Sequence, residues 1–136
     1  MSRADAFFDT NVVLYLLSED EAKADRAEGL LAAGGAISVQ VLNEFAAVAS
    51  RKLRMSWMEI REALNLVRAV CQVHPLSLET HERAVEVAER YGLSLYDAVI
   101  VSAALLAGCK TLYSEDMQDS RVIERQLKVR NPVGKP

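Results

Sequence analysis

Short apolar segments alternate with longer amphipathic ones along this chain, and this alternation constrains the fold more than any other feature. "AFF" at 6–8 and "AIS" at 36–38 have the length of buried strands, whereas 39–53 repeats apolar residues at three- and four-residue steps, as an amphipathic helix does. Short strands separated by helices predict an α/β domain with a mostly parallel central sheet and helices on both faces. Such a sheet binds ligands beyond the carboxyl ends of its strands.

The remaining segments fit the same scheme. Ser56 and Glu59 form a capping-box pattern at the start of a helix whose apolar stripe extends to Cys71. Gly34 and Gly35, Gly92 and Gly108 are expected to end three other helices. We expect helical segments at 12–17, 24–35, 56–71, 78–92 and 94–108, and further strands at 73–76, 111–114 and 127–130.

Composition predicts one compact domain over 1–136, with a short tail at 131–136, because 51% of the residues are hydrophobic and no repeat or linker interrupts them. The first residues do not resemble a signal peptide, and the nearly uncharged stretch 98–109 falls short of the roughly 20 residues that span a bilayer. We therefore expect a cytoplasmic protein without a membrane segment. Cys71 and Cys109 are interpreted as buried thiols.

A net charge of −3 argues against a protein that coats nucleic acid with basic residues, although an enzyme that binds nucleic acid locally remains compatible with it. Basic residues gather in "RKLR" at 51–54 and in "RVIERQLKVR" at 121–130. Each cluster fits either a solvated surface or a local contact with a polyanion.

Asp9 stands between two apolar runs, in "FFDTNVVLY", directly after the first predicted strand. Asp, Thr and Asn all cap helices, so Asp9, Thr10 or Asn11 can start the helix near Val12. Asp9 would also stand at the carboxyl edge of the sheet, where ligands bind. Its position therefore permits a structural and a functional interpretation.

Three other segments place carboxylates where apolar packing is expected. Glu44 shares a helix face with Val41 and Val48, and Asp97 precedes the inward stripe of the most apolar helix. Asp97 also completes the capping pattern Ser-x-x-Asp, so it too has a structural interpretation. The segment 111–120 places three carboxylates just after a predicted strand: Glu115, Asp116 and Asp119.

Carboxylates that converge in one cleft raise one another's pKa values unless a cation is present. Mg²⁺ and Mn²⁺ prefer oxygen ligands, and such an ion can activate water for phosphodiester hydrolysis. This chemistry requires no Ser, Cys or His nucleophile, and the sequence offers no convincing triad.

Four motifs in this order resemble the PIN-domain ribonucleases, most closely the VapC-type toxins of bacterial toxin–antitoxin pairs: "FFDTNVVLY", "ISVQVLNEF", "LSLYDAVIVSAA" and "LYSEDMQDS". The resemblance covers essentially the whole chain and implies a PIN-like three-layer α/β domain. It also implies an Mg²⁺- or Mn²⁺-dependent endoribonuclease that cuts RNA, and an antitoxin partner that adds a helix or strand to a groove near the cleft and places a basic side chain among the acids.

The resemblance assigns catalytic and metal-binding roles to Asp9, Glu44, Asp97 and Asp116, with Asp119 able to share or replace the role of Asp116. Thr10 and Asn11 match polar residues that orient the first carboxylate or metal-bound waters, and Ser114 matches a small hydroxyl residue before the last acid. Many relatives have Gly where this chain has Ser120, which leaves open whether Asp116 or Asp119 is the fourth ligand.

Two further functions are compatible with aspartates at strand ends: a phosphoryl-transfer or receiver-type Mg²⁺-binding domain, and a binding module whose carboxylates only cap helices. The first would favour a second aspartate two residues after Asp9, where this chain has Asn11. Apolar stripes on 56–71 and the preceding helix also fit a homodimer, or ordinary core packing.

Overall fold

The computed structural model describes residues 4–133. Its centre is a six-stranded sheet with the order β3-β2-β1-β4-β6-β5. All neighbouring strands pair in parallel except β5 and β6, which are antiparallel. The strands are β1 (Ala6–Phe8), β2 (Gly35–Ser38), β3 (Cys71–His74), β4 (Thr111–Tyr113), β5 (Val122–Ile123) and β6 (Leu127–Arg130).

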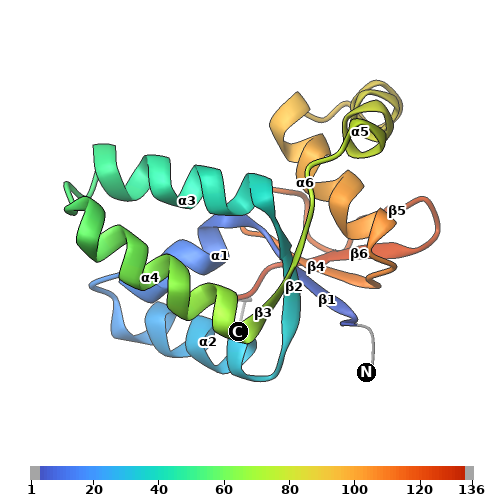
Figure 1. The fold of residues 1–136 in the computed structure, drawn as a ribbon. Coiled ribbons are helices and arrows are strands. Elements are labelled where there is room, and N and C mark those ends of the chain that lie inside the picture. The colour runs from blue at the N-terminus through green and yellow to red at the C-terminus, as the bar shows by residue number, and fades with distance from the viewer. Residues whose placement is uncertain (1–3, 134–136) are drawn as a thin grey trace.

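Helices cover both faces of this sheet (Figure 1). They are α1 (Thr10–Leu14), the 3-10 turn η1 (Tyr15–Leu17), α2 (Glu21–Ala32), α3 (Val39–Arg51), α4 (Trp57–Val70), α5 (Leu78–Tyr91) and α6 (Leu95–Leu106). The helices α1 to α4 lie on one side, and α5 and α6 on the other. The predicted α/β architecture with a mostly parallel central sheet and helices on both faces is confirmed.

The connections explain this division. The chain passes from β1 to β2 and on to β3 in one direction across the sheet, then returns through α5 and α6 to β4, which pairs with the other edge of β1. Because parallel crossovers share one handedness, a reversal of direction moves the helices to the opposite face. The strand order therefore switches beside β1, and ligands bind at such a switch in open α/β sheets.

The core lies between the sheet and these helices. The strand β1 contributes Phe7 and Phe8, both fully buried, and α6 is buried without interruption from Ala98 to Leu105. Within residues 4–133, no helix is long and apolar enough to span a membrane. Cys71 and Cys109 are buried thiols outside any disulfide, as predicted, and burial raises the pKa of Cys71 to about 11.

Several predicted boundaries were wrong by a few residues. The helix α2 begins at Glu21, earlier than 24, because the Asp20 carboxylate caps it by accepting from Ala22 N and Lys23 N. Cys71 was expected to be the last residue of a helix, but α4 ends at Val70 and Cys71 is the first residue of β3, where it pairs with Gly35. The strand β3 therefore begins and ends earlier than the predicted strand 73–76. The capping box of Ser56 and Glu59 is confirmed.

Two features near the C-terminus differ from the expectation. The strand β5 was not predicted and extends the sheet beyond β6. In the predicted tail, Pro132 is buried and its carbonyl accepts a hydrogen bond from Arg26 Nε at 2.8 Å, so 131–133 pack on the domain. Residues 1–3 and 134–136 lie outside the described residues.

Candidate active site

Asp9 lies at the carboxyl end of β1, in the position that the sequence indicated. Its carboxylate caps α1 through Oδ1, which accepts from Thr10 N at 2.7 Å, and its Oδ2 accepts from Ser114 Oγ at 2.7 Å. The residue is 4% exposed. Asp9 itself is the cap, rather than Thr10 or Asn11, and it also faces the site, so the structural and the functional interpretations do not exclude each other.

The environment of Asp9 disfavours its charged form. Burial raises the pKa of Asp9 to about 6, although the hydrogen bonds from Ser114 and Thr10 oppose the shift. The negative charges of Asp97 and Asp116 raise it further. Burial, followed by the charge of Asp116, also raises the pKa of Asp97 above its ordinary value, against the hydrogen bond to Ser94.

Glu44 projects from the middle of α3 and is half-buried, so it does not lean out to water. Its Oε1 accepts a hydrogen bond of 2.5 Å from Thr10 Oγ1, and its Oε2 accepts one of 3.3 Å from Gln40. Thr10 of α1 thereby orients the carboxylate of Glu44, which lies 34 positions later in the chain.

Asp97 occupies the first turn of α6 and is half-buried. Ser94 is the N-cap, and its hydroxyl accepts from Asp97 N at 3.3 Å. The capping pattern therefore uses the backbone of Asp97, and its carboxylate lines the pocket beside Asp9.

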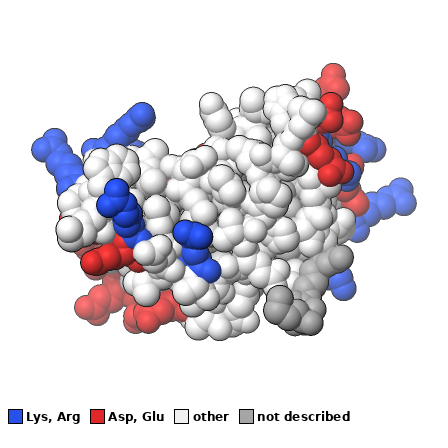
Figure 2. Space-filling view, in the orientation of Figure 1, with Lys and Arg blue, Asp and Glu red and all other residues white. Residues whose placement is uncertain are grey.

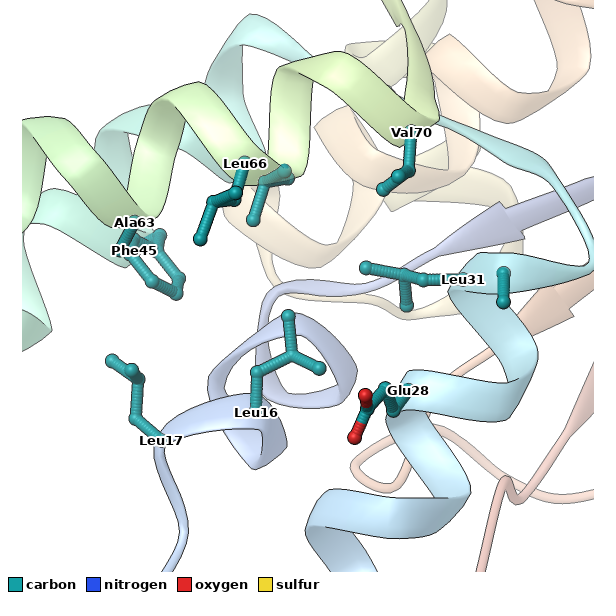
Figure 3. Close-up of a pocket in the computed structure, with 10 residues that line it drawn as sticks. Leu16, Leu17, Glu28, Leu31, Phe45, Ala63, Leu66 and Val70 are labelled. Carbon is teal, nitrogen blue, oxygen red and sulfur yellow. The ribbon is translucent and has the colours of Figure 1, made fainter.

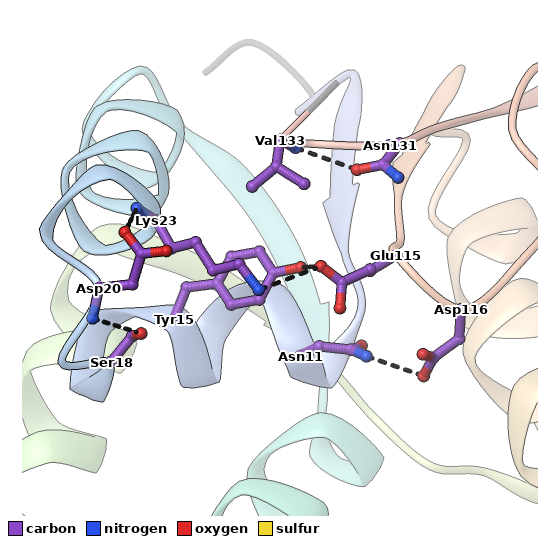
Figure 4. A network of polar contacts seen from close by, with 9 residues as sticks. All are labelled: Asn11, Tyr15, Ser18, Asp20, Lys23, Glu115, Asp116, Asn131 and Val133. Carbon is purple, nitrogen blue, oxygen red and sulfur yellow. Dashed lines mark hydrogen bonds and ion pairs between the residues drawn. The ribbon is translucent and has the colours of Figure 1, made fainter. Parts of the chain in front are cut away.

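Of the three acids after β4, Asp116 alone lines this pocket. Its Oδ2 accepts from Asn11 Nδ2 at 2.8 Å, as Figure 4 shows. The carboxylate of Asp119 accepts from Asn131 N at 2.9 Å instead. Glu115 points to the other side, where it accepts from the Tyr15 hydroxyl and lies 3.7 Å from Lys23 Nζ.

The pocket is an open cleft of ≈ 390 Å³. It brings together all four acids that the resemblance placed first, from four segments distant in sequence, and its lining consists of Asp9, Thr10, Asn11, Leu14, Glu44, Ala47, Val48, Lys52, Asp97 and Asp116. In the described part of the chain, no three acidic, histidine or cysteine side chains stand close enough to hold one metal ion between them.

Sequence reasoning did not anticipate some details of the site. Thr10 and Asn11 were expected to orient the first carboxylate or metal-bound waters. In the structure their side chains hold Glu44 and Asp116, and the Thr10 backbone contacts Asp9. Lys52 was not foreseen in the pocket. Its spacing of eight residues from Glu44 on an amphipathic helix is the signal that could have revealed it.

The sequence matches the PIN domain family over residues 6–123. No curated protein sequence matches the chain. Among solved structures, a toxin–antitoxin complex from Klebsiella pneumoniae is 25% identical with a TM-score of 0.69, and the match covers 93% of this chain and 97% of that one.

Two other solved structures share the fold at lower identity. Mycobacterium tuberculosis VapC20, described as a Sarcin-Ricin loop cleaving toxin, is 23% identical with a TM-score of 0.66, over 82% of this chain and 89% of that one. VapBC2 from Rickettsia felis, bound to a promoter DNA fragment, is 19% identical with a TM-score of 0.67, and the match covers 93% of this chain and 98% of that one. With the family match over most of its length, this chain belongs to the PIN domain family.

Proposed function

We propose that this chain is an Mg²⁺- or Mn²⁺-dependent endoribonuclease and the toxin of a toxin–antitoxin pair. The observation that carries the proposal is the pocket at the carboxyl edge of the sheet, where Asp9, Glu44, Asp97 and Asp116 converge. Membership of the PIN family and the likeness to toxins such as VapC20 support it. The proposed catalytic set is these four acids, with Thr10, Asn11 and Ser114 as supporting residues.

The residues of the pocket fit a hard divalent cation. Their ligand atoms are oxygens. Burial, and to a smaller extent repulsion between the carboxylates, raises the pKa values of Asp9 and Asp97, and a bound cation would favour their charged forms. Mg²⁺ commonly binds through one or two carboxylates and keeps several waters, so the four acids need not all touch it. When bound, such a cation activates water and neutralises charge on a phosphodiester.

The chain's own part is to hold these oxygens in place. Ser114 and the Thr10 backbone fix both oxygens of Asp9, so its carboxylate cannot rotate away from the pocket. Asn11 Nδ2 donates to one oxygen of Asp116, Oδ2. In this proposal Asp116, rather than Asp119, is the fourth acid of the site, because Asp116 lines the pocket and the Asp119 carboxylate accepts from Asn131 N outside it.

The test is cleavage of RNA by purified protein with Mg²⁺, with Mn²⁺ and with EDTA. We expect cleavage only with a divalent cation, and its loss in Asp97→Asn. Asp119→Asn is the matched control, since it neutralises an acid on the neighbouring loop that does not line the pocket. Cleavage that survives both EDTA and Asp97→Asn would contradict the metal mechanism.

The proposed antitoxin has an apolar groove available to it (Figure 3). This groove of ≈ 480 Å³ lies between η1, α2, α3 and α4, and Leu66 and Val70 on its rim are 71% and 51% exposed. The segment of α1 and η1 separates it from the acidic pocket, which Leu14 lines from the other side. An amphipathic antitoxin helix fits such a groove.

Co-purification from the native operon tests this partner. We expect Leu66→Glu to abolish the complex without changing RNA cleavage, because the substitution places a charge in the groove and not in the pocket. A complex that survives Leu66→Glu would place the antitoxin elsewhere.

We also propose a homodimer, but its contact would use residues other than the predicted apolar stripe of α4. The predicted stripe of α4 lies inside the chain, where Ile60 and Val67 are buried, so ordinary core packing explains it. Exposed apolar residues away from the groove, such as Leu78 and Val85 of α5, are candidates for a contact between copies. Light scattering of the purified chain measures its mass directly.

The alternative of a phosphoryl-transfer or receiver-type domain gains no support from the site. Asn11 stands where a phosphohydrolase of that type has its second aspartate, and its amide is used to hold Asp116.

A further inference from the structure

The turn between α3 and α4 carries three basic side chains, Arg51, Lys52 and Arg54, all of them exposed. Within residues 4–133, none of the three has an acidic partner or a side-chain hydrogen bond. Lys23, Arg83 and Arg90, by contrast, each pair with a glutamate. Figure 2 shows basic side chains projecting at the end of the molecule where α3 meets α4. In a chain of net charge −3, this turn is a local positive site.

An aromatic side chain follows directly. Trp57, the only tryptophan of the chain, is the first residue of α4 and is 62% exposed. Exposed aromatic rings beside cations are the combination that binds single-stranded nucleic acid, because bases stack on the ring while cations hold the phosphates. We call residues 51–57 the basic turn.

The acidic pocket is continuous with the basic turn. One wall of the pocket is the face of α3 that carries Glu44, Val48 and Lys52, at intervals of four residues. At a rise of about 1.5 Å per residue, Glu44 and Lys52 are separated by roughly 12 Å along the helix axis. Within residues 4–133, Lys52 forms no ion pair with these carboxylates, and it lines the same cleft.

We propose that a single-stranded RNA runs from the acidic pocket along this face of α3 onto the basic turn, where Lys52 holds a flanking phosphate and Trp57 stacks a base. This inference rests on the proposed ribonuclease function and adds the path of the strand. A duplex does not satisfy it, because paired and stacked bases are not available to the Trp57 ring.

A second copy of the chain is the competing occupant, since Leu53 and Met58 are also exposed here, at 46% and 71%. Charge argues against it. A two-fold contact between copies brings the same patch together from both partners. The unpaired Arg51, Lys52 and Arg54 of one copy would then face those of the other, whereas RNA supplies the opposite charge.

The test uses the full chain with Asp97→Asn, in EDTA, so that RNA is bound and not cut. Fluorescence of Trp57 is recorded while a single-stranded RNA oligonucleotide, and separately its duplex, is added. We expect quenching by the single strand and little change with the duplex. Binding of the single strand without quenching would overturn the stacking of a base on Trp57.

Substitutions separate the two contacts, with labelled RNA and anisotropy as the readout. Trp57→Ala is expected to weaken binding by about 5- to 150-fold, the range for one lost base stack. Lys52→Gln is expected to lower the slope of log K against log salt by about 0.7, the value for one phosphate contact on a single strand. Arg68→Gln, which removes an exposed cation from the last turn of α4, is the control and is expected to change neither.

The outcomes also distinguish this inference from the ribonuclease proposal. Cation-dependent cleavage with unchanged RNA affinity in Lys52→Gln and Trp57→Ala would overturn the path and leave the activity intact. Quenching and salt dependence without any cleavage by the wild-type chain would support the path and refute the activity. If Trp57 fluorescence changes with protein concentration and not with RNA, the basic turn is a contact between copies of the chain. That result would overturn the proposed RNA path.

Discussion

Asp9→Asn is expected to make the protein more stable at neutral pH while it abolishes cleavage. The fold raises the pKa of Asp9 from 3.8 to about 6, chiefly through burial. At about 1.4 kcal/mol per pKa unit, a carboxylate of this kind costs roughly 3 kcal/mol of folding free energy once it is ionised. Asn is neutral at every pH, so the variant avoids this cost.

The sign of the pH dependence follows from the direction of the shift. Because the folded pKa is the higher one, the stability contributed by Asp9 is fully present below pH 3.8 and is lost as the pH rises through about 6. Asn caps helices as well as Asp does, but it has one acceptor oxygen for the two donors, Thr10 N and Ser114 Oγ. Losing one such bond costs about 1 kcal/mol.

The expected gain at pH 8 is therefore about 2 kcal/mol, which corresponds to roughly 6 to 10 °C in Tm for a domain of this size. Below pH 4 the wild type is expected to be the more stable by about 1 kcal/mol. Thermal and urea unfolding of both proteins across this pH range measure the difference. Asp119→Asn is the control, because it removes an acid that lies outside the pocket. An Asp9→Asn variant less stable than the wild type at pH 8 would refute the cost assigned to the buried carboxylate.

Three further predictions concern the frame of the site, and urea unfolding measures each of them. Tyr15→Phe removes the hydroxyl that donates to Glu115, and we expect it to lower the unfolding free energy by about 1 kcal/mol. Gly35→Ala would place a Cβ 2.4 Å from Phe8 Cε2, so a loss of about 1 to 3 kcal/mol is expected, and an unchanged stability would contradict this close contact. Ser120→Gly is expected to stabilise the protein by about 0.5 to 1 kcal/mol, because Ser120 adopts φ 67°, which favours glycine, and a loss would show that the Ser120 side chain matters more than its backbone.

The sequence indicated most of the helices and strands because their signals are local. Periodicity and caps such as Ser56 depend on neighbours in the chain, and they placed the four acids at strand ends or on inward helix faces. The strand β5 lacked such a signal. It has two residues, and the turn that follows it uses Glu124 and Arg125 at φ 53° and 57°, where Asn and Gly are usual. Tertiary contacts stabilise this turn, since Tyr91 Oη accepts from Glu124 N at 2.9 Å.

The choice between Asp116 and Asp119 was likewise beyond local patterns. Their side-chain directions depend on the path of the loop, in which Ser120 takes a left-handed conformation and the Asp119 carboxylate meets the backbone of Asn131. Asn131 lies 12 positions from Asp119, and Asn11, which holds Asp116, lies 105 positions from it, so neither partner has a periodic relation to its acid. The partners of the Thr10 and Asn11 side chains were beyond local patterns for the same reason, because both hydrogen bonds join α1 to residues far away in the sequence.

The pocket differs from the other acidic clusters of this chain in how its carboxylates are held. Glu115 and Glu124 pair with cations, Lys23 in one cluster and Arg83 and Arg90 in the other, and both lie outside the pocket. Inside it, every donor to a carboxylate is a neutral group: the Ser114 and Thr10 hydroxyls, the Thr10 backbone, and the amides of Asn11 and Gln40. Neutral donors orient a carboxylate without cancelling its charge, whereas an arginine there would lower the pKa values and stabilise the fold. Lys52 lines the pocket but pairs with none of these carboxylates, so within residues 4–133 their charge is not neutralised by an ion pair, and a bound cation would balance it. Asp9→Asn measures what this unbalanced charge costs in stability.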